Sequence, residues 1–242
     1  MAEVEADKNN DFDLEIVIKS FKQCRREDGT LTITSVKHDF DVTIVYNAFE
    51  KCVSESGLLL DEYISAFYEL IRFFKLMGRM FAFVSNDLEE KIKILECHRQ
   101  SEKGYHYETI QSMINYEMEN DITSVKGQLP SGSRTLLRLH RALEFILMFM
   151  ERLGRSSDCD KTSHIAADVY KVTLGKYHPW LVQKMASVVM YLLPSRQHLI
   201  ETMCKQSYDQ VLGLIDEAQE VGKPVYDITQ NLYETHKILN LK

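Results

Sequence analysis

The chain has 242 residues, of which 45% are hydrophobic, and its formal net charge at pH 7 is −7. This length allows one large domain or two small ones with a sizeable core, and the acidic balance argues against a general nucleic-acid-binding protein, so any basic site must be local. The polar, acidic start predicts no secretory signal, and the lack of an apolar run of about 18 residues predicts no membrane-spanning helix. The five cysteines are scattered and lack CxxC spacing, which predicts no structural zinc and favours a cytosolic protein with reduced thiols.

The first predicted helix occurs twice in the sequence. DFDLEIVIKSFKQC at residues 11–24 returns as DFDVTIVYNAFEKC at residues 39–52, with seven of fourteen positions identical. Both copies carry apolar residues at i, i+3, i+7 and i+10, which form one face of a helix. Two copies are too few for a solenoid, so we interpret the repeat as a duplicated segment. One copy would fill a helix position in the fold and the other would be surplus, and the sequence does not decide which.

Beyond Gly57 the helical periodicity continues to the end of the chain. No alternating strand series persists, so we expect an all-α fold in a single domain. Thr162 or Ser163 can cap one helix, and Pro179 can occupy the first turn of another. The expected helices cover residues 58–78, 80–99, 106–126, 131–154, 162–178, 179–193, 194–204, 207–222 and 224–239.

The helix expected at residues 131–154 carries a stripe of mixed character. Arg134, Arg138, Ala142, Phe145 and Phe149 follow one another at helical spacing, so this side begins cationic and becomes apolar. A solvated face would stay polar throughout. Two simpler interpretations remain open. The arginines can extend into water from the end of a bundle, and the phenylalanines can belong to an ordinary core.

The helix expected at residues 80–99 shows the opposite gradient, because apolar Val84 is followed at helical spacing by Asp87 and Lys91. If the two helices pack antiparallel, their charged residues meet at one end and their apolar residues at the other. This arrangement gives a polar mouth above an apolar interior, which suits an amphiphilic ligand. The simpler alternative is a surface ion pair between Asp87 and Lys91, worth about 0.2–0.5 kcal/mol.

Several stretches resemble the glycolipid transfer protein superfamily, in the family's order and across nearly all of residues 39–242. The resemblance implies a two-layer, all-α sandwich that encloses the chains of a lipid and recognises its head at the surface. It also implies a lipid-binding domain at residues 39–242 and an extra segment at residues 1–38, because the family has a single amino-terminal helix. The matching stretches are FKQC (21–24), LLLDEYISAF (58–67), FVSNDLEEKIKIL (83–95), SGSRTLLRLHRAL (131–143), YHPWLVQKMASVVMYLLPSR (177–196) and VYDITQNLYETHKIL (225–239).

The resemblance implies a role for individual residues. Asp87 would bind the amide nitrogen of a ceramide, and His178 would bind its acyl carbonyl. Lys91, Arg134 and Arg138 would hold the head group. The glycolipid-binding branch of the family carries tryptophan at the position of Arg138, whereas the phosphate-binding branch carries arginine, as this chain does.

A phosphorylated head group agrees with these residue types. A phosphate monoester carries about −1.5 to −2 charges near neutral pH, and guanidinium groups bind its oxygens in bidentate fashion. The phosphate-binding branch also has a basic residue in the preceding loop, for which Lys126 is the nearest match. Asp87 would repel phosphate but can accept a hydrogen bond from a sphingoid amide, which favours ceramide-1-phosphate over phosphatidic acid. Alternatively, Asp87 only orients Lys91.

The implied function is non-vesicular transfer of ceramide-1-phosphate between membranes, by a protein that is not an enzyme and needs no cofactor or metal. Exposing a lipid chain to water costs about 0.8 kcal/mol per CH₂, so the interior must be apolar, and Val84, Phe145 and Phe149 are predicted to line it. Trp180, the only tryptophan, is predicted to touch the membrane transiently. A buried anchor is the alternative role for Trp180.

Two other classes of function compete with lipid transfer. An enzyme is disfavoured because no GxSxG, HExxH or P-loop motif frames the serine, histidine and aspartate residues. A lipid sensor or helical adaptor, in which the surplus amphipathic helix serves as a docking element, stays open. So does transfer of another anionic lipid such as phosphatidic acid.

Overall fold

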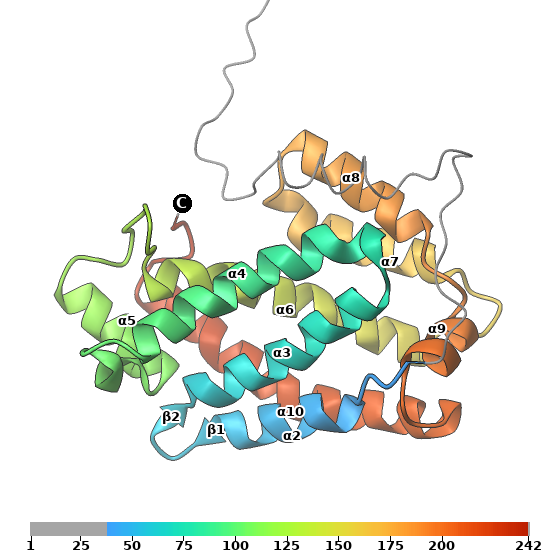
Figure 1. Ribbon diagram of the computed structural model, residues 1–242, viewed down its shortest axis with the longest axis horizontal. Coiled ribbons are helices and arrows are strands. Elements are labelled where there is room, and N and C mark those ends of the chain that lie inside the picture. The colour runs from blue at the N-terminus through green and yellow to red at the C-terminus, as the bar shows by residue number, and fades with distance from the viewer. Residues whose placement is uncertain (1–37, 242) are drawn as a thin grey trace, which may run out of the picture.

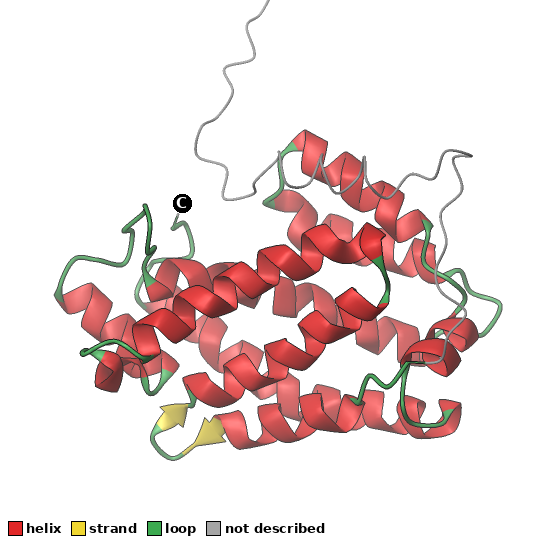
Figure 2. Cartoon of the chain, viewed as in Figure 1, coloured by secondary structure: helices red, strands yellow, loops and turns green. Residues whose placement is uncertain are grey.

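A computed structural model describes residues 38–241 of the chain, and nearly all of its regular structure is helical (Figures 1 and 2). The first repeat copy, residues 11–24, lies outside the described residues, as does most of the segment 1–38. Two short strands, β1 (Val53–Ser54) and β2 (Gly57–Leu58), pair in an antiparallel hairpin. The helices are α2 (Val42–Cys52), α3 (Leu60–Leu76), α4 (Ala82–Arg99), α5 (Ile110–Glu119), α6 (Gly132–Arg155), α7 (Thr162–Val172), α8 (Trp180–Tyr191), α9 (Arg196–Met203) and α10 (Tyr208–Thr235).

The second repeat copy, residues 39–52, forms α2. Asp41 caps this helix, because its Oδ1 accepts a hydrogen bond from the backbone N–H of Thr43 at 3.0 Å. The apolar face of α2 is buried between α3 and α10. The sequence left open which copy occupies this position, and the structure places residues 39–52 there.

The helices form two layers. Figure 1 shows α3 and α4 crossing in front of α6 and α10. Helix α2 packs against both α3 and α10, while α4 packs against α6, so these five helices surround a common interior. Helices α7 and α8 extend the structure beside α6, and α5 covers the opposite end of α6. The expected all-α, two-layer sandwich is therefore confirmed.

The expectation of two separate helices at 207–222 and 224–239 is wrong, because α10 runs without a break from Tyr208 to Thr235 with Pro224 inside it. An interior proline costs about 3 kcal/mol, but α10 packs on α2 and α6 along its length. Buried residues lie on both sides of the proline, among them Ala218 and Val225. At Gly222 an added Cβ would lie 2.8 Å from Leu147 of α6, so the two helices approach closely there. Tertiary packing thus outweighs the local preference for a break.

Within residues 38–241, no helix combines the length and the apolar character needed to cross a bilayer.

Candidate functional site

A cavity of about 720 Å³ lies between the two layers. It is lined mainly by apolar side chains from α2, α3, α4, α6, α7, α8, α9 and α10. Phe145 and Phe149 stand in its wall with parallel rings whose centroids are 5.8 Å apart, and Val84 lies in the wall contributed by α4. These three side chains were expected to line an apolar interior, and all three do.

A polar cluster lines part of the same cavity, and α4 contributes an acid–base pair to it. Lys91 Nζ lies 2.6 Å from Asp87 Oδ1, and both residues line the cavity. The two side chains are only 10% and 20% exposed. The i, i+4 spacing produces the contact, but the pair is not the solvated surface ion pair that spacing alone allowed.

Helix α6 brings arginine to the cavity. Ser131 caps the helix with a side-chain hydrogen bond to the backbone N–H of Arg134, and Arg138 reaches the cavity wall one turn later. The Arg138 guanidinium donates to the backbone oxygen of Arg134 at 2.5 Å. Burial, together with the neighbouring charge of Arg141, lowers the pKa of Arg138 to about 10. The attraction of an anionic ligand would offset the free-energy cost of desolvating this cation.

Arg141, which the predicted stripe on α6 did not include, also lines the cavity. Its guanidinium carbon lies 3.9 Å from the centre of the Tyr177 ring, a cation–π contact, and its NH2 group donates to the backbone oxygen of Leu239 at 2.9 Å. Arg141 therefore joins α6 to the loop before α8 and to the carboxyl-terminal residues. Its position three residues after Arg138 was the available signal, because i and i+3 share a helix face.

His178 completes the polar cluster from the loop before α8. Its Nδ1 lies 2.7 Å from the Tyr170 hydroxyl of α7, and both residues line the cavity. Burial, together with the positive charges of Lys91 and Arg141, lowers the pKa of His178 to about 4. The imidazole is therefore neutral near pH 7. When Nδ1 accepts the Tyr170 hydroxyl hydrogen, Nε2 carries the ring hydrogen and can donate it.

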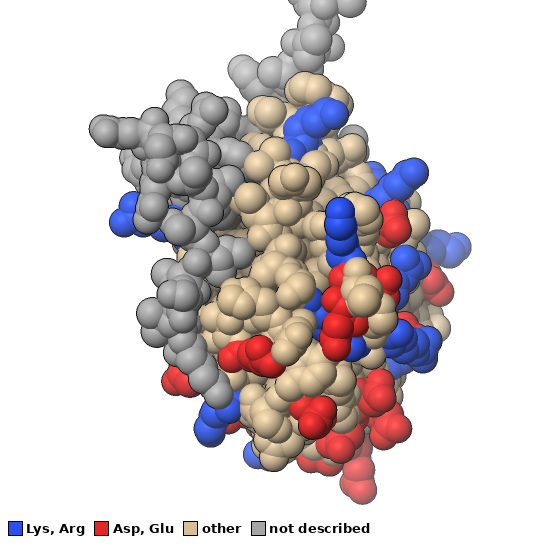
Figure 3. Space-filling view, turned by 90° about the vertical axis from the view of Figure 1, so that its right-hand side faces the viewer, with Lys and Arg blue, Asp and Glu red and all other residues tan. Residues whose placement is uncertain are grey.

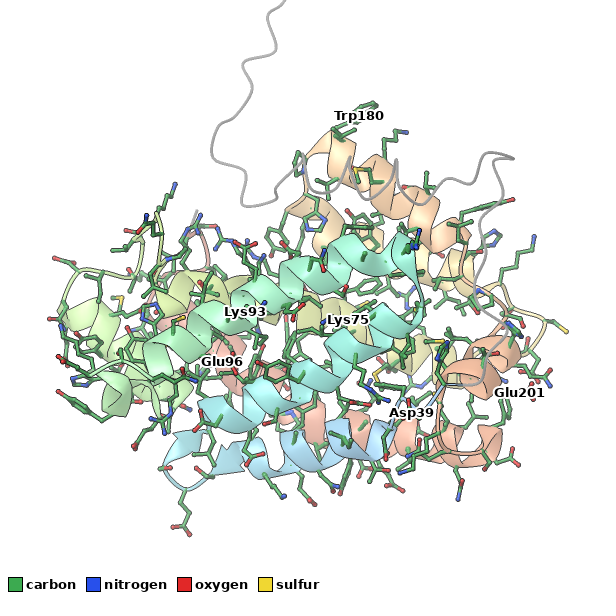
Figure 4. The ribbon with its side chains drawn as sticks, viewed as in Figure 1. Asp39, Lys75, Lys93, Glu96, Trp180 and Glu201 are labelled. Atoms are coloured by element: carbon green, nitrogen blue, oxygen red, sulfur yellow. The ribbon has the colours of Figure 1, made fainter. Side chains whose placement is uncertain are left out.

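The structure does not place every predicted site residue on the cavity. Arg134 is 6% exposed and lies one turn nearer the start of α6 than Arg138, but it is not among the lining residues. Lys126 is exposed in the loop between α5 and α6. Trp180 is 69% exposed at the start of α8 and points away from the body of the molecule (Figure 4), so the buried-anchor interpretation is wrong.

The buried histidine His140 makes the stability of the protein depend on pH. His140 is 2% exposed, its Nε2 lies 2.8 Å from Gln230 Oε1, and burial lowers its pKa to about 4. The unfolded chain binds a proton at this histidine near pH 6.5 and the folded chain only near pH 4, so the free energy of unfolding falls as pH decreases between these values. Between pH 7 and pH 5, the unfolding free energy of the His140→Gln variant should fall by about 2 kcal/mol less than that of the wild type, measured by urea unfolding. His164→Gln, on the exposed side of α7, should keep the wild-type pH dependence, and an identical slope in both variants would contradict this assignment.

Two helical layers around an apolar cavity with a cationic cluster in its wall define a lipid-binding protein of the helical-sandwich class. A family model described as glycolipid transfer protein (GLTP) matches residues 58–205, and the chain belongs to this family. It is 37% identical to the mouse ceramide-1-phosphate transfer protein over 240 residues, which cover 97% of this chain and 99% of that one. It is 41% identical to the zebrafish (Danio rerio) protein of the same name over 182 residues, 74% of this chain and 86% of that one.

A solved structure agrees with this assignment. The crystal structure of human ceramide-1-phosphate transfer protein in complex with 2:0 ceramide-1-phosphate superposes with a TM-score of 0.79 at 35% identity, covering 84% of this chain and 100% of that one.

Proposed function

We propose that this protein transfers ceramide-1-phosphate between membranes, holding the phosphorylated head at the polar cluster and the hydrocarbon chains in the cavity. The observation that carries the proposal is the position of Arg138, Lys91 and Asp87 on the wall of one apolar cavity. A purely structural ion pair would not need an apolar space of this size beside it. Relatives named for the same lipid support the choice of ligand.

In the proposed complex, Arg138 and Lys91 bind the phosphate. Guanidinium offers a planar pair of donors and ammonium adds a point charge, so together they can neutralise a dianionic group. Arg134 is proposed to support the head group from its position one turn earlier on α6. Lys126, in the exposed loop before α6, is proposed to approach the phosphate from outside the cavity, where long-range attraction is screened by salt.

The amide region of the lipid is assigned to Asp87 and His178. Asp87 accepts a hydrogen bond from the ceramide N–H while its other contact, to Lys91 Nζ, stays in place. Neutral His178 donates from Nε2 to the acyl carbonyl because Tyr170 occupies Nδ1. Phosphatidic acid has no amide N–H, so Asp87 would keep its contact with Lys91 but lose the hydrogen bond from the lipid, a loss of about 1.5–3 kcal/mol.

The chains are removed from the bilayer by exchange of one apolar environment for another. A sixteen-carbon chain exposed to water would cost about 13 kcal/mol at roughly 0.8 kcal/mol per CH₂. Contacts to the head group contribute a few kcal/mol net, so they cannot offset this cost alone. The apolar walls around Phe145, Phe149 and Val84 therefore supply most of the free energy that keeps the lipid in the protein.

The proposal is tested by transfer between donor and acceptor vesicles. We expect ceramide-1-phosphate to move at least about tenfold faster than galactosylceramide, since a tenfold preference needs only about 1.4 kcal/mol of head-group discrimination. Phosphatidic acid should fall between the two. Equal rates for the phosphate-headed and sugar-headed lipids would refute the assignment of the head-group site.

We also propose that the protein acts without chemical conversion, on the cytosolic faces of membranes. Mass spectrometry of lipid recovered from the acceptor vesicles should then show unchanged ceramide-1-phosphate. Recovery of ceramide, or of a deacylated product, would indicate catalysis at the same site.

Membrane contact is assigned to α8. Trp180, Leu181, Val188 and Tyr191 are exposed apolar residues on this helix, and the helix contains Lys184 but no acidic residue. Figure 3 shows few acidic side chains at the top of the molecule, where α8 lies in Figure 1, and many more in the lower half of the view. Aromatic residues of this kind favour the interface between water and lipid.

Trp180→Ala is expected to slow transfer about fivefold, because loss of roughly 1 kcal/mol of interfacial burial weakens docking. The amount of lipid bound per chain after long incubation should not change. Tyr105→Ala removes an aromatic side chain that is also exposed, at 65%, but lies outside α8, so it serves as the matched control. If both variants transfer lipid at the wild-type rate, α8 is not the docking surface.

A further inference from the structure

The sequence that forms α2 recurs in a second segment of the same chain, residues 11–24. Asp41 fixes the start of α2, accepting hydrogen bonds from Thr43 N and from Lys205 Nζ at 3.0 and 2.9 Å, and its own N–H donates to Glu69 Oε1 at 2.8 Å. Below this cap, one face of the helix is buried against α3 and α10. The buried residues of α2 are Val42, Val45, Ala48, Phe49 and Cys52.

The first repeat copy carries a matching residue at the capping position and at each of the five buried positions of α2. Asp13 stands where the second copy has the capping residue Asp41. The five buried positions are matched by four apolar or thiol side chains and one small serine in place of alanine, a set of nearly the same volume and polarity. The residues at these positions in the first copy are Leu14, Val17, Ser20, Phe21 and Cys24.

The correspondence extends past the helix into the hairpin and then stops. Gly57 has φ +125°, a conformation that other residues rarely adopt, and the first copy has Gly29 at the same place. Leu58 is 0% exposed, but its counterpart is Thr30. The first copy can therefore supply the cap, the helix and the turn, while Leu58 and the helices after it stay where they are.

A shift of the chain by 28 residues would exchange the two copies. Residues 30–57, which include the displaced second copy, would then form a loop at the position of the β1–β2 turn, which lies at the edge of the molecule in Figure 1. The cost of closing such a loop grows only slowly with its length. The short turn that now follows α2 therefore favours the second copy without forbidding the first.

The exchange would reach the lipid site, since Phe40, Val42 and Val45 line the cavity. In the first copy these positions carry Phe12, Leu14 and Val17. The only difference is one additional methylene, at Leu14, which would narrow the cavity locally. Asp87, Lys91 and Arg138 stand on α4 and α6 and would not move with the exchange.

We propose that residues 11–24 are a second, exchangeable occupant of the α2 position, so that one chain can build the cavity wall from either repeat copy. The second copy is the occupant in the structure, and the first takes its place when the second is disabled. Only the consequence for lipid-chain fit rests on the proposed transfer function. The exchange itself follows from the match between the first copy and the α2 position.

Thiol labelling of the full chain tests the exchange without any lipid, because each copy has a cysteine at the same buried position. Phe49→Asp places a charge in the core and should expel the second copy. We expect the maleimide labelling rate of Cys52 to rise to that of exposed Cys97, and that of Cys24 to fall at least about tenfold from its wild-type value, as burial removes the thiol from solvent. Peptide mass spectrometry identifies which cysteine has reacted.

Two further variants separate an exchange of the repeat copies from a general loss of structure. Ile44→Asp introduces the same charge on the face of α2 that is 46% exposed, and it should leave the wild-type labelling pattern intact. Phe21→Asp combined with Phe49→Asp disables both copies and should abolish cooperative thermal unfolding, which Phe49→Asp alone should retain. The proposal is overturned if Phe49→Asp unfolds like the double variant or leaves Cys24 unprotected. It is also overturned if protection of Cys24 depends on protein concentration, which would indicate exchange between chains.

Discussion

Arg138→Leu is expected to lower the transfer rate of ceramide-1-phosphate between vesicles about 10- to 100-fold. The guanidinium lines the cavity, and burial already lowers its pKa to about 10, so it is a desolvated cation whose interaction with a phosphate is weakly screened. A hydrogen bond between charged groups in such a place contributes about 1.5–3 kcal/mol, which corresponds to this range of rates. Leucine keeps much of the apolar packing and removes only the donor groups.

Two controls separate the head-group effect from a general loss of structure. Arg152→Leu makes the same change on an exposed turn of α6 and should leave transfer near the wild-type rate. Arg138→Lys should give an intermediate rate, because a lysine supplies charge without the bidentate geometry. Unchanged transfer by Arg138→Leu would remove this residue from the site.

Glu117→Ala is expected to cost about 3–5 kcal/mol of unfolding free energy, because each buried donor left unsatisfied costs about 1–3 kcal/mol, and this is the largest stability effect that we anticipate for a single polar residue. Glu117 is 0% exposed. Its carboxylate accepts hydrogen bonds from the backbone N–H groups of Gly132 and Ser133 at 2.7 and 2.8 Å and from the Tyr107 hydroxyl at 3.1 Å. Removing it leaves three buried donors without an acceptor and takes a negative charge from the amino-terminal end of α6, where the helix dipole favours one.

The measurement is urea unfolding at pH 7, with Glu119→Ala as the control. Glu119 lies on the same helix but is exposed, so its loss should change the unfolding free energy by less than about 0.5 kcal/mol. Glu117→Ala should also reduce transfer, because α6 carries Arg138 and Arg141 to the cavity. A cost below about 1 kcal/mol for Glu117→Ala would contradict the assigned role.

Helical periodicity made the centre of the site predictable. Asp87 and Lys91 are four residues apart on α4, and their contact follows from that spacing. Helical spacing alone likewise predicted that the residues from Arg138 to Phe149 form one side of α6, which changes from cationic to apolar along the cavity wall. These contacts lie within single helices, where sequence spacing and spatial proximity coincide.

Contacts between distant segments were not predictable in the same way. Arg141 donates to Leu239, which is 98 residues later in the chain, and Glu117 binds the start of α6 across a loop. Pro224 falls inside α10 because packing against other helices outweighs its local preference. Periodicity describes which face of a helix is buried, but it does not say which partner the face meets.

The repeat posed a different problem. Both copies satisfy the same pattern of buried positions, so local preference could not distinguish them. The short β1–β2 turn does, because it joins the second copy directly to the fully buried Leu58, whereas residues 30–57 separate the first copy from Leu58. The feature that favours one occupant therefore lies outside the segment that repeats most closely.

Native mass spectrometry of the full chain tests most directly whether the cavity takes up a phosphorylated sphingolipid. The protein is incubated with vesicles that contain equal amounts of ceramide-1-phosphate, ceramide and phosphatidic acid, and is then separated from them. We predict a single adduct per chain with the mass of ceramide-1-phosphate, and its loss in Arg138→Leu. A chain that emerges without lipid, or that carries ceramide as readily as its phosphate, would contradict enclosure by the cavity and selection by the cationic cluster.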